Sequence, residues 1–114
     1  MRFAVSLVAA AMLVPAVALA ETWSVSEGKD GMSGEWTVNI AGDQVSGMAV
    51  MQRRGGGVMT YRIVGRAKDG GYTLSRVEAP DVEKCSYVAK GAGPAFTGTS
   101  ICNGAQGPWR VTRK

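Results

Sequence analysis

The chain has 114 residues, of which 13 are lysine or arginine, 9 are aspartate or glutamate and none is histidine, giving a formal net charge of +4. The missing histidine removes the usual proton shuttle near neutral pH, and with it serine and cysteine triads and most catalytic metal sites. The basic residues are scattered rather than gathered in one run, so we do not expect nucleic acid as a partner.

The first 20 residues have the pattern of a secretory signal peptide. One positive charge at Arg2 precedes an apolar run over 3–18, which ends in the small-residue sequence Ala18-Leu19-Ala20. The run is short for a membrane-spanning helix, and polar residues follow from Glu21. We therefore expect residues 1–20 to be removed and residues 21–114 to form one small domain in the periplasm or outside the cell, without stable membrane insertion.

The region after residue 20 predicts strands. It holds all 16 glycines, and short alternating apolar runs recur between Gly, Pro, Asp and Asn clusters without a sustained helical period. That pattern is typical of a small all-β domain. The expected strands are 22–26, 35–40, 44–52, 58–65, 72–78, 84–89, 95–102 and 109–113.

The first expected hairpin turns at Gly42-Asp43, a glycine-first pair suited to a two-residue turn. In this register Trp36 faces an alanine, which gives the indole room. Met48 and Val50 fall on the other face. This placement requires either a bulge near Gly47 or an exposed apolar pair, and the sequence leaves both open.

Residues 52–57, with the sequence QRRGGG, predict a mobile, positively charged loop. A phosphate-binding loop also uses glycines, but it requires a following helix with Lys and Ser or Thr. Residues 58–61 instead begin a strand, so we do not expect a nucleotide here.

The next hairpin turns at Asp69-Gly70, a strong two-residue turn signal. Its register places Arg76 on the apolar side of the sheet. One interpretation is a structural arginine at a sheet end, stacked on an aromatic ring or paired with a carboxylate such as Glu78. The other is an anchor for a ligand.

The only two cysteines flank a third hairpin. With its turn centred between Gly93 and Pro94, Cys85 faces Cys102, and directly opposed residues lie within the Cα range that a disulfide spans. We expect a structural disulfide in an exported chain. A structural metal usually takes four protein ligands, and two thiols without histidine predict none. Residues 103–104 and 107–108 are then expected to turn the chain into the last strand.

Seven or eight strands joined by short connections predict an antiparallel up-and-down meander, closed or nearly closed into a small barrel with one disulfide. A barrel of this size is expected to be filled by side chains rather than to hold a large cavity. The residues expected to point inward are Trp23, Trp36, Val38, Ile40, Val45, Met59, Tyr61, Ile63, Tyr72, Leu74, Tyr87, Phe96, Trp109 and Val111.

The sequence Gly34-Glu35-Trp36, together with Arg110 beside Trp109 on the last strand, resembles the marks of the calycin barrels. That group includes lipocalins, avidins and the small barrel inhibitors of bacterial metalloproteases. In these families the tryptophan of an early Gly-x-Trp packs under an arginine from the closing strand. The resemblance implies such a pair between Trp36 and Arg110 or Arg113, and binding rather than catalysis, with an exported protease inhibitor as the best match in size and compartment.

We therefore expect a non-catalytic, monomeric binding protein without a cofactor, whose partner is a small apolar or anionic ligand or an exported protein. The candidate binding residues are Arg76, Trp109 and Arg110, because guanidinium groups beside indoles favour anionic or carboxylate-bearing partners. A cell-envelope structural or stress protein without a discrete ligand is the alternative. A hydrolase that uses Glu78 with Asp81 or Glu83 is a third hypothesis, disfavoured because acidic residues around a turn are usually solvated.

Overall fold

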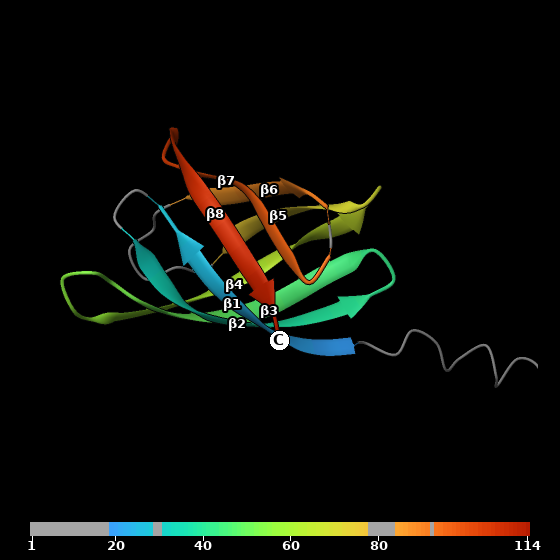
Figure 1. Cartoon of the computed structure of the whole chain (residues 1–114), viewed down its shortest axis with the longest axis horizontal. Coiled ribbons are helices and arrows are strands. Elements are labelled where there is room, and N and C mark those ends of the chain that lie inside the picture. Colours follow the sequence, from blue (N-terminus) through green and yellow to red (C-terminus); the bar gives the residue numbers. More distant parts are fainter. Residues whose placement is uncertain (1–18, 29–30, 78–83, 92) are drawn as a thin grey trace, which may run out of the picture.

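The computed structural model describes residues 19–28, 31–77, 84–91 and 93–114. Eight antiparallel strands pair in chain order, and the last pairs with the first, so the sheet closes into a barrel (Figure 1). The strands are β1 (Leu19–Glu27), β2 (Met32–Ala41), β3 (Gln44–Gln52), β4 (Val58–Lys68), β5 (Gly71–Val77), β6 (Cys85–Lys90), β7 (Ala95–Cys102) and β8 (Ala105–Arg113). The expected fold class, an all-β meander closed into a barrel with one disulfide, is confirmed.

The three expected registers are also confirmed. Trp36 faces Ala49 across β2 and β3, and Arg76 faces Ile63 across β4 and β5. Across β6 and β7, Cys85 faces Cys102 and forms the disulfide. Pairing between β2 and β3 runs without a bulge. Met48 and Val50 are therefore an exposed apolar pair, with about half of each residue's surface accessible.

The last turn differs from the expectation. Asn103 and Gly104 both have positive φ, 50° and 85°, which is the backbone of a two-residue hairpin turn. The chain therefore returns at once, and β8 begins at Ala105. Gly107 and Pro108, expected in a turn, lie within β8, where the Pro108 carbonyl accepts a hydrogen bond from the Gly28 N–H.

Aromatic rings fill the middle of the barrel. Trp36 lies at the centre of this layer, with its ring centroid 5.1 to 6.3 Å from the centroids of Trp23, Tyr61, Tyr87 and Trp109. Every residue expected to point inward is buried except Ile40, which is half-buried and packs against the core. The expectation of a filled interior therefore holds for this layer.

The strands coil tightly around these rings because glycines permit close contact between neighbouring strands. A Cβ atom at Gly98 would lie only 2.2 Å from the Val88 carbonyl oxygen, and one at Gly65 only 2.1 Å from that of Thr73. Glycines at such positions are a common device for curving a sheet into a barrel.

One end of the barrel is closed around Trp23. Arg113 donates two hydrogen bonds to Glu21, at 2.6 and 3.0 Å, and the Trp23 indole N–H donates to the same carboxylate at 2.7 Å. Arg113 lies directly across from Trp23 in the sheet, whereas Arg110 is exposed. We expected an arginine of the closing strand to lie beside Trp36. The structure instead places Arg113 beside Trp23.

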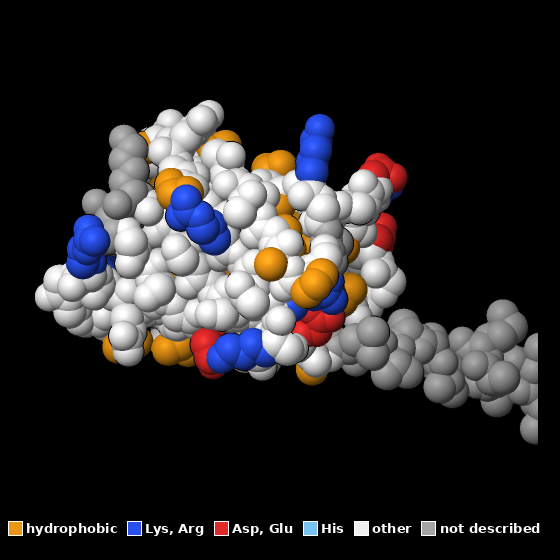
Figure 2. Space-filling model, in the orientation of Figure 1, with side chains coloured by type: hydrophobic (Ala, Val, Ile, Leu, Met, Phe, Trp, Pro, Cys, Tyr) orange, Lys and Arg blue, Asp and Glu red, His pale blue; other side chains and the backbone are white. Residues whose placement is uncertain are grey.

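The outer surface carries both basic and acidic side chains, some of them in exposed ion pairs such as Arg66 with Asp43. Figure 2 shows lysine and arginine side chains spread over the face in view rather than gathered into one patch. No helix among the described residues is long and apolar enough to cross a membrane.

The Arg113 hydrogen bonds, supported by the Trp23 N–H and opposed by burial, hold the pKa of Glu21 below its usual value. A lowered folded-state pKa contributes stability that is present above the unfolded-state pKa and is lost as the pH falls through the folded-state pKa. Glu21→Gln should therefore lower the free energy of unfolding by about 1 kcal/mol at neutral pH.

In urea titrations, this difference from the wild type should shrink toward zero in acid. Glu35→Gln, which removes an exposed partner of Lys114, serves as the control and should cost less. An equal cost of Glu21→Gln at neutral and acidic pH would contradict the assignment.

The disulfide joins cysteines 17 residues apart. Closing a loop of that length stabilises a fold by about 3 kcal/mol in the chain-entropy model. Cys85→Ser combined with Cys102→Ser should therefore lower the melting temperature by several degrees while the circular dichroism spectrum stays that of the barrel. A double variant that melts within a degree or two of the oxidised wild type would show that the bridge adds little.

Candidate ligand-binding site

The other end of the barrel holds a buried ion pair. Glu27 is the last residue of β1 and continues the inward alternation of Trp23 and Val25. Arg76 points inward from β5, and its Nη2 lies 3.0 Å from Glu27 Oε1. The two side chains are 2% and 0% exposed, so neither charge is solvated by bulk water. Charges buried to this degree require partners within the protein.

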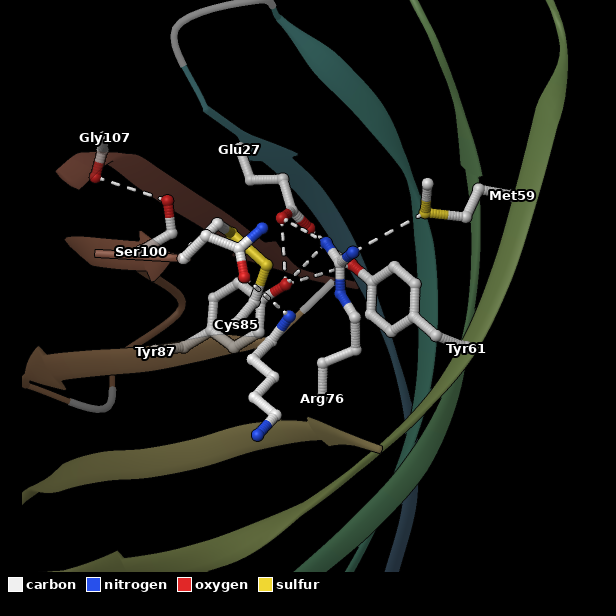
Figure 3. Close-up of a disulfide and its surroundings, with 11 residues drawn as sticks. Glu27, Met59, Tyr61, Arg76, Cys85, Tyr87, Ser100 and Gly107 are labelled. Carbon is white, nitrogen blue, oxygen red and sulfur yellow. Dashed lines mark hydrogen bonds and ion pairs between the residues drawn. A yellow bond between two sulfur atoms is a disulfide. The ribbon is translucent and has the colours of Figure 1, made fainter. Parts of the chain in front are cut away.

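Two tyrosines complete this cluster (Figure 3). The Tyr87 hydroxyl donates to Glu27 Oε1 at 2.8 Å and accepts from Arg76 Nη2 at 3.1 Å. The Tyr61 hydroxyl donates to Glu27 Oε2, and the Arg76 guanidinium carbon lies 4.1 Å from the centroid of the Tyr61 ring. We call these four residues, Glu27, Tyr61, Arg76 and Tyr87, the polar cluster.

Protonation states follow from the surroundings. Burial raises the pKa of Tyr61 and of Tyr87 far above the usual phenol range, and the Glu27 carboxylate adds to both shifts. Both hydroxyls therefore keep their protons and act as donors to Glu27. Burial acts to lower the pKa of Arg76, but the oxygens of its neighbours outweigh that effect and raise it, so the guanidinium stays charged.

A cleft of about 610 Å³ opens above the polar cluster. Glu27 and Arg76 contribute to its lining, and Met59 approaches Arg76, with its sulfur 3.6 Å from Nη1. Much of the remaining lining comes from methionines, from Cys102 of the disulfide and from small residues. Arg53 and Arg54 contribute from the loop after β3. The lining residues are Glu27, Gly28, Met32, Arg53, Arg54, Gly55, Met59, Arg76, Ser100, Cys102, Ala105, Gln106 and Gly107.

The three residues predicted to bind a ligand do not come together. Arg76 lies inside the barrel, in the polar cluster, and Trp109 is fully buried in the aromatic layer. Arg110 is exposed and lines a separate groove of about 570 Å³ on the outer face of the barrel, shared with Glu35. A binding role for each of the three stays a prediction.

The structural interpretation of Arg76 is supported, because Arg76 pairs with a buried carboxylate. Glu27 pairs with it, across 49 residues of sequence, whereas Glu78 lies outside the described residues. The hydrolase hypothesis rests on Glu78, Asp81 and Glu83, all of which fall outside the described residues.

Glu27 was not predicted as a site residue because the expected first strand ended one residue too early. Trp23 and Val25 point inward at alternate positions, and continuing this alternation by one step would have predicted an inward Glu27.

One group of potential metal ligands occurs among the described residues. The carboxylate of Glu27 and the sulfurs of Cys85 and Cys102 lie within 4.8 Å of one another. In the disulfide form the sulfurs are not thiolates and are poor metal ligands.

No protein-family model matches the chain, and no curated protein is similar to it in sequence. Among solved structures, the chain is similar to a redesigned β-barrel, mFAP1, which was determined bound to DFHBI. The TM-score is 0.68 at 18% identity, over 92% of this chain and 98% of that one. This likeness shows that the two share a small barrel fold, and membership of the calycin group stays a prediction.

The polar cluster predicts unequal costs for removing tyrosine hydroxyls. Tyr61→Phe and Tyr87→Phe keep the rings and remove hydroxyls that donate to a buried carboxylate, and the Tyr87 hydroxyl also accepts from Arg76, so each change should lower the free energy of unfolding by about 1.5–3 kcal/mol. Tyr72→Phe, buried at the opposite end of the barrel, is the matched control and should cost less. Urea unfolding measures all three, and equal costs would contradict the hydrogen bonding described above.

Proposed function

We propose that this protein is an exported, non-catalytic binding protein that holds a small apolar ligand with a negatively charged group in the cleft above the polar cluster. The observation that carries the proposal is the cleft itself. Its volume of about 610 Å³ lies within the range of small-molecule sites, and it combines apolar walls with a few charged groups.

The apolar part of the ligand is assigned to the walls. Met32 and Met59 offer flexible, polarizable thioethers that adapt to irregular shapes. Cys102 and Ala105 lie in the wall formed by β7 and β8. In the loop that follows β3, Gly55 lines the cleft, and Gly56 and Gly57 after it have φ of 103° and 95°, a backbone that few other residues could adopt.

The charged part follows from the balance of charges. Among the described residues that line the cleft, three are arginines and one is a carboxylate. Arg76 pairs with Glu27 within the polar cluster, and the exposed Arg54 adds a positive charge at the mouth. Guanidinium groups bind carboxylates and phosphates through paired hydrogen bonds, so an anionic head group suits this mouth.

The polar cluster supports a binding role over catalysis. Its carboxylate accepts hydrogen bonds from both tyrosines and from Arg76, so these groups are engaged with one another in the floor of the cleft. The similar barrel, mFAP1, was solved with a small molecule bound, which supports the same use of this fold. Export, to the periplasm or the medium, is inferred from the pattern of the first 20 residues.

Decanoate and decanol form a matched pair of probes that differ mainly in charge. Titration of the protein with each, followed by backbone amide NMR, should show saturable decanoate binding and weaker decanol binding. The shifts should centre on the cleft, at Gly55, Ser100 and Gln106. Arg54→Glu should weaken decanoate binding about tenfold, equivalent to about 1.4 kcal/mol.

Arg66→Glu is the matched control, because it makes the same change of net charge at an exposed arginine that pairs with Asp43 near the opposite end. Arg110→Ala tests the residue predicted from sequence and should leave decanoate affinity unchanged. The proposal fails if decanoate does not bind saturably, if decanol binds as well, or if the shifts gather around the outer groove at Arg110.

A further inference from the structure

The ligand atoms of Glu27, Cys85 and Cys102 form a group that neither the aromatic core nor the proposed ligand explains. They lie within 4.8 Å of one another, and Cys85 and Glu27 are buried. Metal–sulfur and metal–oxygen bonds to zinc are about 2.0 to 2.3 Å long, so atoms held this close can share one ion after small movements. The sequence predicts no metal site because it contains only two thiols and no histidine. The fold places the Glu27 carboxylate, from β1, beside both sulfurs.

The surroundings of Glu27 resemble those of a positioned metal ligand. Oε1 accepts hydrogen bonds from Arg76 and Tyr87, and Oε2 accepts one from Tyr61. A carboxylate offers about four lone-pair positions, so Oε2 keeps one for an ion. Hydrogen bonds of this kind fix the orientation of metal-binding carboxylates.

The cleft borders this group, whose most exposed member is Cys102. Glu27 and Cys102 both line the cleft, so a reductant and an ion reach the disulfide from the same side. Figure 3 shows the disulfide next to Tyr87 and facing the region of Glu27. A water molecule from the cleft would complete four-coordination, as in zinc sites with three protein ligands.

We propose that the reduced form of this protein binds one thiophilic divalent cation, of the zinc and cadmium class, through Cys85, Cys102 and Glu27. This goes beyond the proposed ligand-binding function, which concerns the oxidised form. A dithiol reductant supplies two electrons and two protons to break the S–S bond, and is itself oxidised to a disulfide. Binding of the cation then releases both thiol protons and leaves two metal–thiolate bonds.

Cadmium titration of the phosphine-reduced protein, freed of reductant under anaerobic conditions, tests this directly. The sulfur-to-cadmium charge-transfer absorption should rise and saturate at one ion per chain, and the melting temperature of the reduced protein should increase. The oxidised protein should show neither change. X-ray absorption of the zinc-loaded protein should show two sulfur and two lighter ligands.

Variants separate the contribution of each ligand. Cys102→Ser keeps the Glu27–Arg76 pair and should abolish the charge-transfer signal at one equivalent. Glu27→Gln should weaken binding more than tenfold, the range seen even for residues that only support a metal ligand. Glu21→Gln is the matched control, since Glu21 also pairs with an arginine on the inside of the barrel but at the far end, and it should leave affinity unchanged.

Four results would overturn the proposal. These are no saturable signal in the reduced protein, loss of the barrel on reduction as judged by circular dichroism, a shell of four sulfurs that indicates bridging between chains, and unchanged affinity in a folded Glu27→Gln variant. If Glu27→Gln does not fold, X-ray absorption of the zinc-loaded wild type decides, with two sulfur neighbours supporting the proposal and four contradicting it. None of these results bears on decanoate binding by the oxidised form.

Discussion

The buried pair of Glu27 and Arg76 is the interaction on which this end of the barrel depends. Removing two opposite charges from water costs several kcal/mol per ion, and their attraction offsets that cost only with good geometry and further hydrogen bonds. Tyr61 and Tyr87 supply those bonds, so the cluster ties β1, β4, β5 and β6 together around one carboxylate. Its members are 11 to 60 residues apart in sequence, and only the closed barrel assembles them.

Each end of the barrel holds an arginine–glutamate pair, but the two pairs differ in exposure to water. At one end, Arg113 and Glu21 form a partly exposed pair beside Trp23, and the charges remain in contact with water. At the other end, the polar cluster lies deeper and leaves a cleft above it. The aromatic layer around Trp36 separates the two ends. This asymmetry places a cleft at one end of the barrel, and this cleft is where we propose that a ligand binds.

Much of the fold was predictable because hairpin registers depend on short-range signals. The turns at Gly42-Asp43 and Asp69-Gly70 fixed which side chains face each other, including the inward direction of Arg76. The disulfide followed from the same reasoning. Pro108 misled the prediction because Gly-Pro is a turn signal, yet Asn103-Gly104 alone completes the turn.

The candidate site was harder to predict, since it depends on which strand ends meet when the sheet closes. The inward direction of Arg76 was predictable, but its pairing with Glu27 was not, because Glu27 lies 49 residues away at the last position of β1. Strand ends are the least certain part of any sequence-based assignment. Trp109 and Arg110 are neighbours in sequence, but alternation along β8 sends one into the core and the other to the outside.

A double-mutant cycle between Glu27 and Arg76 tests the central claim most directly. Glu27→Gln and Arg76→Met each remove one charge of the buried ion pair, which should cost about 3–5 kcal/mol of unfolding free energy. The combined variant leaves neither charge, so its cost should fall clearly below the sum of the two, with a coupling of about 2 kcal/mol or more. Additive costs, measured by urea unfolding of the three folded variants, would contradict the view that this pair organises the end of the barrel.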